Sequence, residues 1–159
     1  MPDNKLNILM FSGDYDKALA GLILANSAAA SGFSATMFFA FWGLLLLRDP
    51  NKSTDNRKDF LKKMFGKVTP RGPDELQLSR LNLSGFGKKM LEKMMTAEQA
   101  PDLYSFLQQA RDRGVQFCCC QLSAEIMGFT KEELLPEVNF MTAEDYLNDA
   151  LKSDIKLFI

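Results

Sequence analysis

Residues 6–40 read LNILMFSGDYDKALAGLILANSAAASGFSATMFFA, and this stretch carries the pattern that decides the fold. Its first six residues form a short, largely apolar run that is typical of a buried strand, and a second such run follows at 33–40. Between them, residues 16–31 are rich in small side chains and stop at Gly32, as expected of a helix that lies close to a sheet. A strand, a helix and a strand in this order predict parallel strands joined by a right-handed crossover.

The rest of the chain extends the same α/β pattern to an open sheet of four or five mostly parallel strands. We expect one domain over 1–159, with an irregular, basic insertion at about 48–85 that is punctuated by Pro and Gly. The predicted elements are helices over about 55–65, 86–96 and 101–113, helix starts at Thr130 and Thr142, and strands over 114–120 and 155–159.

The charge of the chain is nearly balanced overall, at −1, but it is unevenly distributed. Residues 48–93 hold twelve Lys or Arg and six Asp or Glu, so this segment is basic and the remainder is acidic. A basic segment can steer an acidic partner, or it can be a solvated surface insertion. Nucleic-acid binding is not expected, because no basic stripe interleaved with aromatic residues is evident.

The apolar stretch at 35–47 raises the question of a membrane segment. It is thirteen residues long, whereas a span needs roughly 20, so we predict a buried strand followed by a helix and no membrane association. No secretory signal pattern precedes the first strand, and three cysteines are an odd number for a disulfide framework. A reducing, cytoplasmic setting is therefore expected.

Three consecutive cysteines, Cys118, Cys119 and Cys120, close the strand predicted at 114–120, in a chain that has no histidine. Cys120 comes last, directly before a short helix that ends at Gly128, and the amino end of a helix stabilises a thiolate. Cys118 and Cys119 lie within the strand, where we expect buried small side chains or accessory thiols. No metal is expected, because one strand cannot aim three adjacent thiols at a tetrahedral ion.

Three of the predicted strand ends carry unusual residues, and parallel strands bring such ends to one edge of the sheet. Gly13 and Asp14 follow the first strand, and the adjacent strand ends should lie about 4.8 Å apart. We expect one pocket there, with Ser123 as the N-cap of the short helix. Its predicted residues are Gly13, Asp14, Phe41, Trp42, Gly43, Gln121 and Ser123. No glycine-rich nucleotide fingerprint follows the first strand, so no cofactor is expected.

Five segments are informative together: FSGDYDKALA at 11–20, TMFFAFWGL at 36–44, MFGK at 64–67, PRGP at 70–73, and CQLS at 120–123 with Met127 and Gly128. They resemble the DsrE/DsrF-like sulfurtransferase family, in its single-chain branch known as peroxiredoxin-like or DsrE-type. The resemblance covers nearly the whole chain and implies a flavodoxin-like three-layer α/β/α fold, a homo-oligomer and a catalytic Cys120 that carries sulfane sulfur as a persulfide. It also suggests small sulfur-carrier or rhodanese-type proteins as sulfur donor and acceptor.

The expected function is therefore that of a sulfur carrier or sulfurtransferase that relays sulfur between partner thiols. Such an exchange needs no imidazole, because the donor supplies an electrophilic sulfur. One alternative is a peroxidase-like thiol redox protein, although the usual peroxidatic Pro-x-x-x-Thr-x-x-Cys pattern is absent. Another is a non-enzymatic module that binds a small ligand or a protein and whose three thiols are buried.

Overall fold

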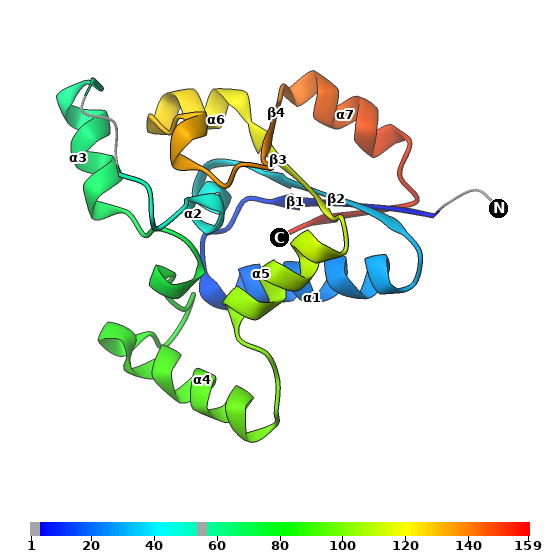
Figure 1. Cartoon of the computed structure of the whole chain (residues 1–159), viewed down its shortest axis with the longest axis horizontal. Coiled ribbons are helices and arrows are strands. Elements are labelled where there is room, and N and C mark those ends of the chain that lie inside the picture. The colour runs from blue at the N-terminus through cyan, green and yellow to red at the C-terminus, as the bar shows by residue number, and fades with distance from the viewer. Residues whose placement is uncertain (1–3, 54–56) are drawn as a thin grey trace.

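Parallel strands form one open five-stranded sheet in the computed structural model, which describes residues 4–53 and 57–159 (Figure 1). The strand order is β4-β3-β2-β1-β5, and every pair of neighbours in the sheet is parallel. Met10 pairs with Phe39, and Phe39 pairs with Cys119, so the three central strands end at one edge. The strands are β1 (Lys5–Met10), β2 (Ser34–Phe39), β3 (Gln116–Cys120), β4 (Asn139–Met141) and β5 (Ile155–Phe158).

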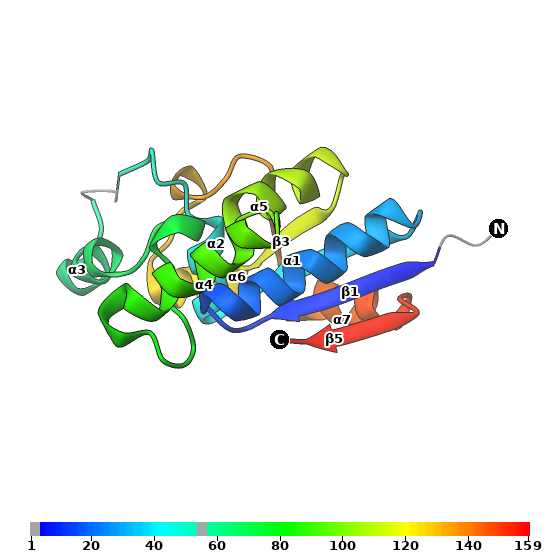
Figure 2. The same cartoon turned by 90° about the horizontal axis from the view of Figure 1, so that it is seen from below.

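Helices cover both faces of this sheet. Helices α1 (Tyr15–Ala30) and α5 (Leu103–Asp112) lie side by side on one face, and α7 (Ala143–Leu151) covers the other (Figures 1 and 2). A Cβ atom at Gly21 of α1 would lie 2.6 Å from the Met10 sulfur, so the helix lies close to the sheet at this position. The prediction of a flavodoxin-like three-layer fold is confirmed, with all sheet strands parallel.

The main core lies between the sheet and the pair α1 and α5. Ile8, Met10, Met37, Phe39 and Phe117 are all almost fully buried, and strand alternation turns them toward the same face. The opposite face is also covered, so the central strands are buried on both sides, and that face includes the buried polar residues Asn7 and Thr36 as well as Phe38. That double burial is why the sequence shows continuous apolar runs.

Most predicted elements are present, with ends shifted by a few residues. Helix α3 covers Phe60–Val68, and the predicted start at Asp55 lies outside the described residues. Capping boxes at Thr130 and Thr142 are confirmed. Strand β4 was not predicted, because its three residues begin with an exposed Asn139 and form no apolar run. The remaining helices are α2 (Leu44–Leu47), α4 (Phe86–Ala97), α6 (Gln121–Met127) and the short 3₁₀ helices η1 (Phe41–Gly43), η2 (Pro73–Glu75), η3 (Leu83–Gly85) and η4 (Lys131–Glu133).

The apolar stretch at 35–47 forms β2, η1 and α2, as the prediction of a strand followed by a helix requires. Across the two described ranges, 4–53 and 57–159, no helix has both the length and the apolar character needed to cross a bilayer.

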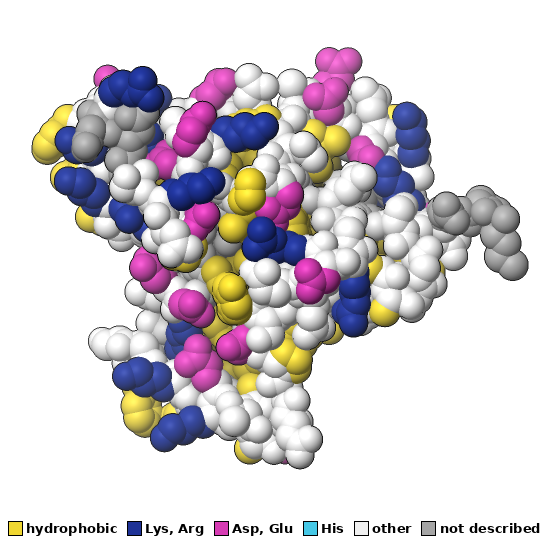
Figure 3. Space-filling view, in the orientation of Figure 1, with side chains coloured by type: hydrophobic (Ala, Val, Ile, Leu, Met, Phe, Trp, Pro, Cys, Tyr) yellow, Lys and Arg dark blue, Asp and Glu magenta, His cyan; other side chains and the backbone are white. Residues whose placement is uncertain are grey.

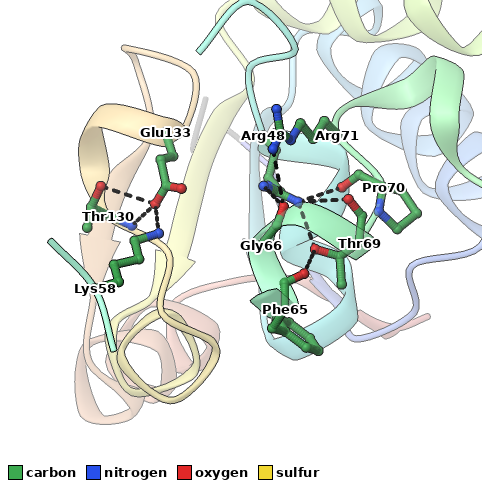
Figure 4. A network of polar contacts seen from close by, with 9 residues as sticks. All are labelled: Arg48, Lys58, Phe65, Gly66, Thr69, Pro70, Arg71, Thr130 and Glu133. Atoms are coloured by element: carbon green, nitrogen blue, oxygen red, sulfur yellow. Dashed lines mark hydrogen bonds and ion pairs between the residues drawn. The ribbon is translucent and has the colours of Figure 1, made fainter. Parts of the chain in front are cut away.

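A buried arginine anchors the insertion at 48–85 to the body of the molecule (Figure 4). Arg48 is 2% exposed and donates hydrogen bonds to the carbonyl oxygens of Gly66 (2.7 Å), Thr69 (3.0 Å) and Pro70 (3.1 Å). Its guanidinium carbon also lies 4.6 Å from the centre of the Phe129 ring. These carbonyls stand at the carboxyl end of α3, where a cation offsets the negative end of the helix dipole. The insertion is thus partly helical and fixed at this end.

A second buried charge ties the start of the insertion to the loop before β4. Glu133 accepts a hydrogen bond from the Thr130 amide (2.9 Å) and pairs with Lys58 (Figure 4). Its backbone carbonyl accepts from the Asp49 amide (2.9 Å). Arg48 and Leu134 also form an isolated antiparallel bridge. The base of the insertion therefore packs as part of the domain.

Candidate functional site

The carboxyl ends of β1, β2 and β3 meet at one edge of the sheet, and the loops that follow them are in contact. The Ala40 amide donates to the Met10 carbonyl (3.0 Å), and the Gly43 amide donates to the Phe11 carbonyl (3.1 Å). Continuing the register of β2 and β3 by one residue places Ala40 beside Cys120. Cys120 thus lies one strand away from the loop that contains Phe41 and Trp42.

Two predicted pocket residues, Gly13 and Gly43, allow these loops to approach closely. A Cβ atom at Gly43 would lie 2.1 Å from the Met10 carbonyl oxygen, and one at Gly13 would lie 2.6 Å from the Trp42 carbonyl oxygen. Neither position has room for a side chain. Both glycines shape the site through the backbone.

Cys120 is the most accessible of the three thiols. It is partly exposed, whereas Cys118 and Cys119 are buried, and all three are free cysteines. The strand runs straight into α6, so Cys120 itself is the N-cap residue of that helix. Its backbone is extended (φ −63°, ψ 114°), and the first amides of α6 follow directly.

Burial suppresses ionisation of the other two thiols. The pKa of Cys118 is raised to about 11, mainly by burial and to a smaller degree by Asp149 on α7, while Lys5 opposes the shift. Burial likewise raises the pKa of Cys119 to about 12. Both side chains are therefore protonated at neutral pH and act as small core residues, since the thiolate is the nucleophilic form.

The prediction that Ser123 caps α6 is wrong. The helix begins at Gln121, so Ser123 falls inside its first turn, where it is 1% exposed and its hydroxyl has no hydrogen-bond partner among the described residues. Gln121 is exposed, and its side-chain amide donates to Glu125 (3.0 Å) along the outer surface of α6. Ser123 is therefore buried inside the first turn of α6, and the side chain of Gln121 lies along the outside of the helix.

A cavity of about 490 Å³ opens between the loop after β1 and the insertion. Of the predicted residues, Gly13, Asp14 and Trp42 line it, while Cys120, Phe41, Gly43, Gln121 and Ser123 are not in its lining. The predicted pocket is therefore not a single one, because the cavity takes in three of the predicted residues and does not include the thiol. The lining consists of Phe11, Ser12, Gly13, Asp14, Lys17, Trp42, Leu45, Pro70 and Gln77.

The cavity contains residues that the sequence did not single out. Lys17 forms an ion pair with Asp14 (3.3 Å) one turn away on the same helix, a spacing that was visible in the sequence. Pro70 and Gln77 come from the insertion, and the Gln77 carbonyl accepts a hydrogen bond from the Tyr15 amide (2.7 Å). Only the tertiary fold brings those two to the site.

Phe41, the first residue of η1, has a strained backbone conformation. Its φ of 49° is unusual for a residue with a bulky side chain. Its ring lies 5.9 Å from that of Phe11, which in turn stacks on Phe158 (6.1 Å). Three exposed aromatic rings thus follow the edge of the sheet next to the thiol.

The chemistry available here is that of a thiol. Cys120 offers a partly exposed sulfur, and the cavity lined by Asp14, Lys17 and Trp42 offers a carboxylate, an ammonium group and an indole ring. In the parts of the chain that the structure describes, no group of three or more Cys, Asp or Glu side chains could hold a metal ion.

Two proteins of known sequence are similar to this chain over nearly its whole length. It is 38% identical over 155 residues to the uncharacterized protein YrkE of Bacillus subtilis, covering 98% of this chain and 96% of that protein. It is 28% identical over 164 residues to the sulfur carrier protein DsrE2 of Allochromatium vinosum, with both chains fully covered.

The fold has a counterpart among solved structures. The crystal structure of the ychN protein from E. coli superposes with a TM-score of 0.56, covering 99% of each chain at 9% sequence identity, and so supports the fold alone. The sequence model of the DsrE/DsrF/DrsH-like family matches residues 2–158. With the match spanning nearly every residue, the chain belongs to the DsrE/DsrF/DrsH-like family.

Proposed function

We propose that this protein is a sulfur-relay carrier in which Cys120 holds sulfane sulfur as a persulfide. The observation that carries the proposal is the contrast within the cysteine triplet: Cys120 is partly exposed at the edge of the sheet, while Cys118 and Cys119 are buried with raised pKa values. Family membership and a relative named as a sulfur carrier support the same chemistry.

The exchange is balanced without an oxidant or a cofactor. The Cys120 thiolate attacks the outer sulfur of a donor persulfide, the donor S–S bond breaks, and the donor leaves as a thiolate. An acceptor thiolate then attacks the outer sulfur of the Cys120 persulfide and releases the Cys120 thiolate. One sulfur atom moves in each step. The donor and acceptor in this proposal are small sulfur-carrier or rhodanese-type proteins, in the cytoplasm, and the carrier is a homo-oligomer.

Mass spectrometry after incubation with cysteine persulfide tests the assignment. One added sulfur, about 32 Da, should appear on the peptide that contains Cys120 and should pass to a second thiol. Cys120→Ser should abolish the adduct, whereas Cys118→Ser and Cys119→Ser should keep it. Loading that survives Cys120→Ser would sink the assignment.

A peroxidase-like activity is the rival chemistry for the same thiol. It predicts rapid consumption of hydrogen peroxide and a sulfenic acid on Cys120. Peroxide turnover with no persulfide loading would replace the carrier proposal by this one.

A further inference from the structure

An apolar groove of about 380 Å³ runs between α3 and α6, close to the proposed carrier thiol. Four of its side chains are well exposed to solvent: Leu61, Met64, Val68 and Ile126. Large apolar side chains that gather in an exposed groove mark a place where another molecule binds. The groove is lined by Leu61, Lys62, Met64, Phe65, Val68, Ile126 and Met127.

Helix α6 connects this groove to Cys120. Leu122 and Ile126 are one turn apart on the same exposed side of α6, and Leu122 is only two residues beyond Cys120. At a rise of 1.5 Å per residue, Ile126 is about 9 Å from Cys120 along the axis of α6. A segment seated in the groove can therefore bring its own thiol to Cys120.

The groove is held in place by packing on both sides. The Phe65 ring lies 6.0 Å from Trp42 and 6.1 Å from Phe129. The stem of Lys62 crosses Gly128, where an added Cβ would lie 2.7 Å from the Lys62 Cβ. Arg48 fixes the carboxyl end of α3. The two helices are thus positioned before any partner arrives.

Lysines flank the apolar face of α3. Helical spacing puts Lys62 on one flank and Lys67 on the other, with Lys63 one turn before Lys67 and farther round the helix. Figure 3 shows dark blue side chains beside exposed yellow ones over this helix. Within residues 4–53 and 57–159, none of these three lysines forms an ion pair. Glu125, on the exposed side of α6, accepts a hydrogen bond from Gln121.

We infer that this groove docks an acidic amphipathic helix of the protein that exchanges sulfur with Cys120, an inference that rests on the carrier function proposed above. Apolar side chains at helical spacing would enter the groove, and flanking carboxylates would meet the lysines. Helix α3 has nine residues and is about 14 Å long, so the contact is small. Small interfaces suit a partner that must leave after each exchange, whereas a second copy of the chain would need a larger one.

Two matched peptides test the docking. Each is a short helix with leucines at helical spacing and one cysteine persulfide near its end; one carries glutamates on its flanks and the other carries lysines in their place. The acidic peptide should load Cys120 with sulfur at least ten times faster than the basic one at low salt. Each loading rate is divided by the rate at which free cysteine persulfide loads the same protein.

Charge-reversal variants locate the effect. Lys63→Glu combined with Lys67→Glu should reduce the preference for the acidic peptide to about two-fold or less. Lys89→Glu combined with Lys93→Glu places the same charge change on α4 and should leave the preference in place. Equal loading by both peptides, or an equal loss in the α4 control, would overturn the inference.

Binding of the same peptides with serine in place of cysteine separates docking from sulfur chemistry. Fluorescence anisotropy should show tighter binding of the acidic peptide to the wild-type chain and at least ten-fold weaker binding to Met64→Asp. Docking without any loading of Cys120 would refute the carrier function while retaining the groove. Loss of self-association by Met64→Asp in light scattering, with no peptide bound by the wild type, would assign the groove to a second copy and overturn the inference.

Discussion

At the scale of single residues, three adjacent cysteines have different chemistry because the strand ends at the third. Burial raises the pKa of Cys118 to about 11, so at pH 8 roughly one molecule in a thousand carries its thiolate. Iodoacetamide should therefore label Cys120 at least ten times faster than Cys118 or Cys119 in the native protein. Peptide mass spectrometry over a time course measures this, and similar rates at all three positions would contradict the burial argument.

The buried thiols also make stability depend on alkaline pH. The pKa of Cys118 rises from 9.0 to about 11 on folding, so the folded state retains a proton that the unfolded state releases. The resulting stabilisation is complete below pH 9 and is lost as the pH rises through about 11.

Cys118→Ala isolates that contribution. The variant lacks the titrating thiol, so the advantage of the wild type in free energy of unfolding should shrink by about 1–3 kcal/mol between pH 8 and pH 11. Burial also raises the pKa of Tyr15 and Tyr146, but those residues are present in both proteins. Urea unfolding at several pH values measures the difference, and parallel curves would refute the assignment.

At the scale of elements, Arg48 decides where α3 lies. Replacing it with methionine leaves the carbonyls of Thr69 and Pro70 without their donor and should lower the free energy of unfolding by about 2–4 kcal/mol. Arg80→Met, at an exposed arginine, should change stability by less than about 0.5 kcal/mol. Urea denaturation compares the two variants, and equal effects would show that the buried network contributes nothing.

Elements with strong local signals could be predicted from the sequence. The capping boxes at Thr130 and Thr142 and the apolar runs of β1 and β2 are properties of short segments, and the structure confirms them. Strand β4 has no such signal, because its pairing with β3 defines it.

The contrast between local signals and contacts distant in sequence also explains which residues of the candidate site could be predicted. The end of the predicted strand and the helix pattern directly after it were enough to single out Cys120, which is partly exposed at the end of β3. The cap at Ser123 was misplaced because strand and helix join with no intervening turn residue. Pro70 and Gln77 reach the cavity through contacts distant in sequence, which no local pattern encodes.

At the scale of the whole molecule, the buried sheet contrasts with the two arms, α3 and α4, that project from one end (Figures 1 and 2). Helix α4 contributes no buried residue, and in α3 only Gly66 is buried. Phe86, Met90 and Met94 lie exposed along α4. Few buried contacts give a segment a low free energy of local opening.

Amide hydrogen exchange should therefore be graded across the molecule. In dilute protein, amides of α4 should exchange at least ten times faster than those of β1, β2 and β3, because the strands open only with the whole domain. An acidic helical peptide should slow exchange in α3 and leave α4 unchanged, since it occupies the groove beside α6. Protection of α4 equal to that of β1, rising with protein concentration, would instead show that a second copy covers the exposed face of α4.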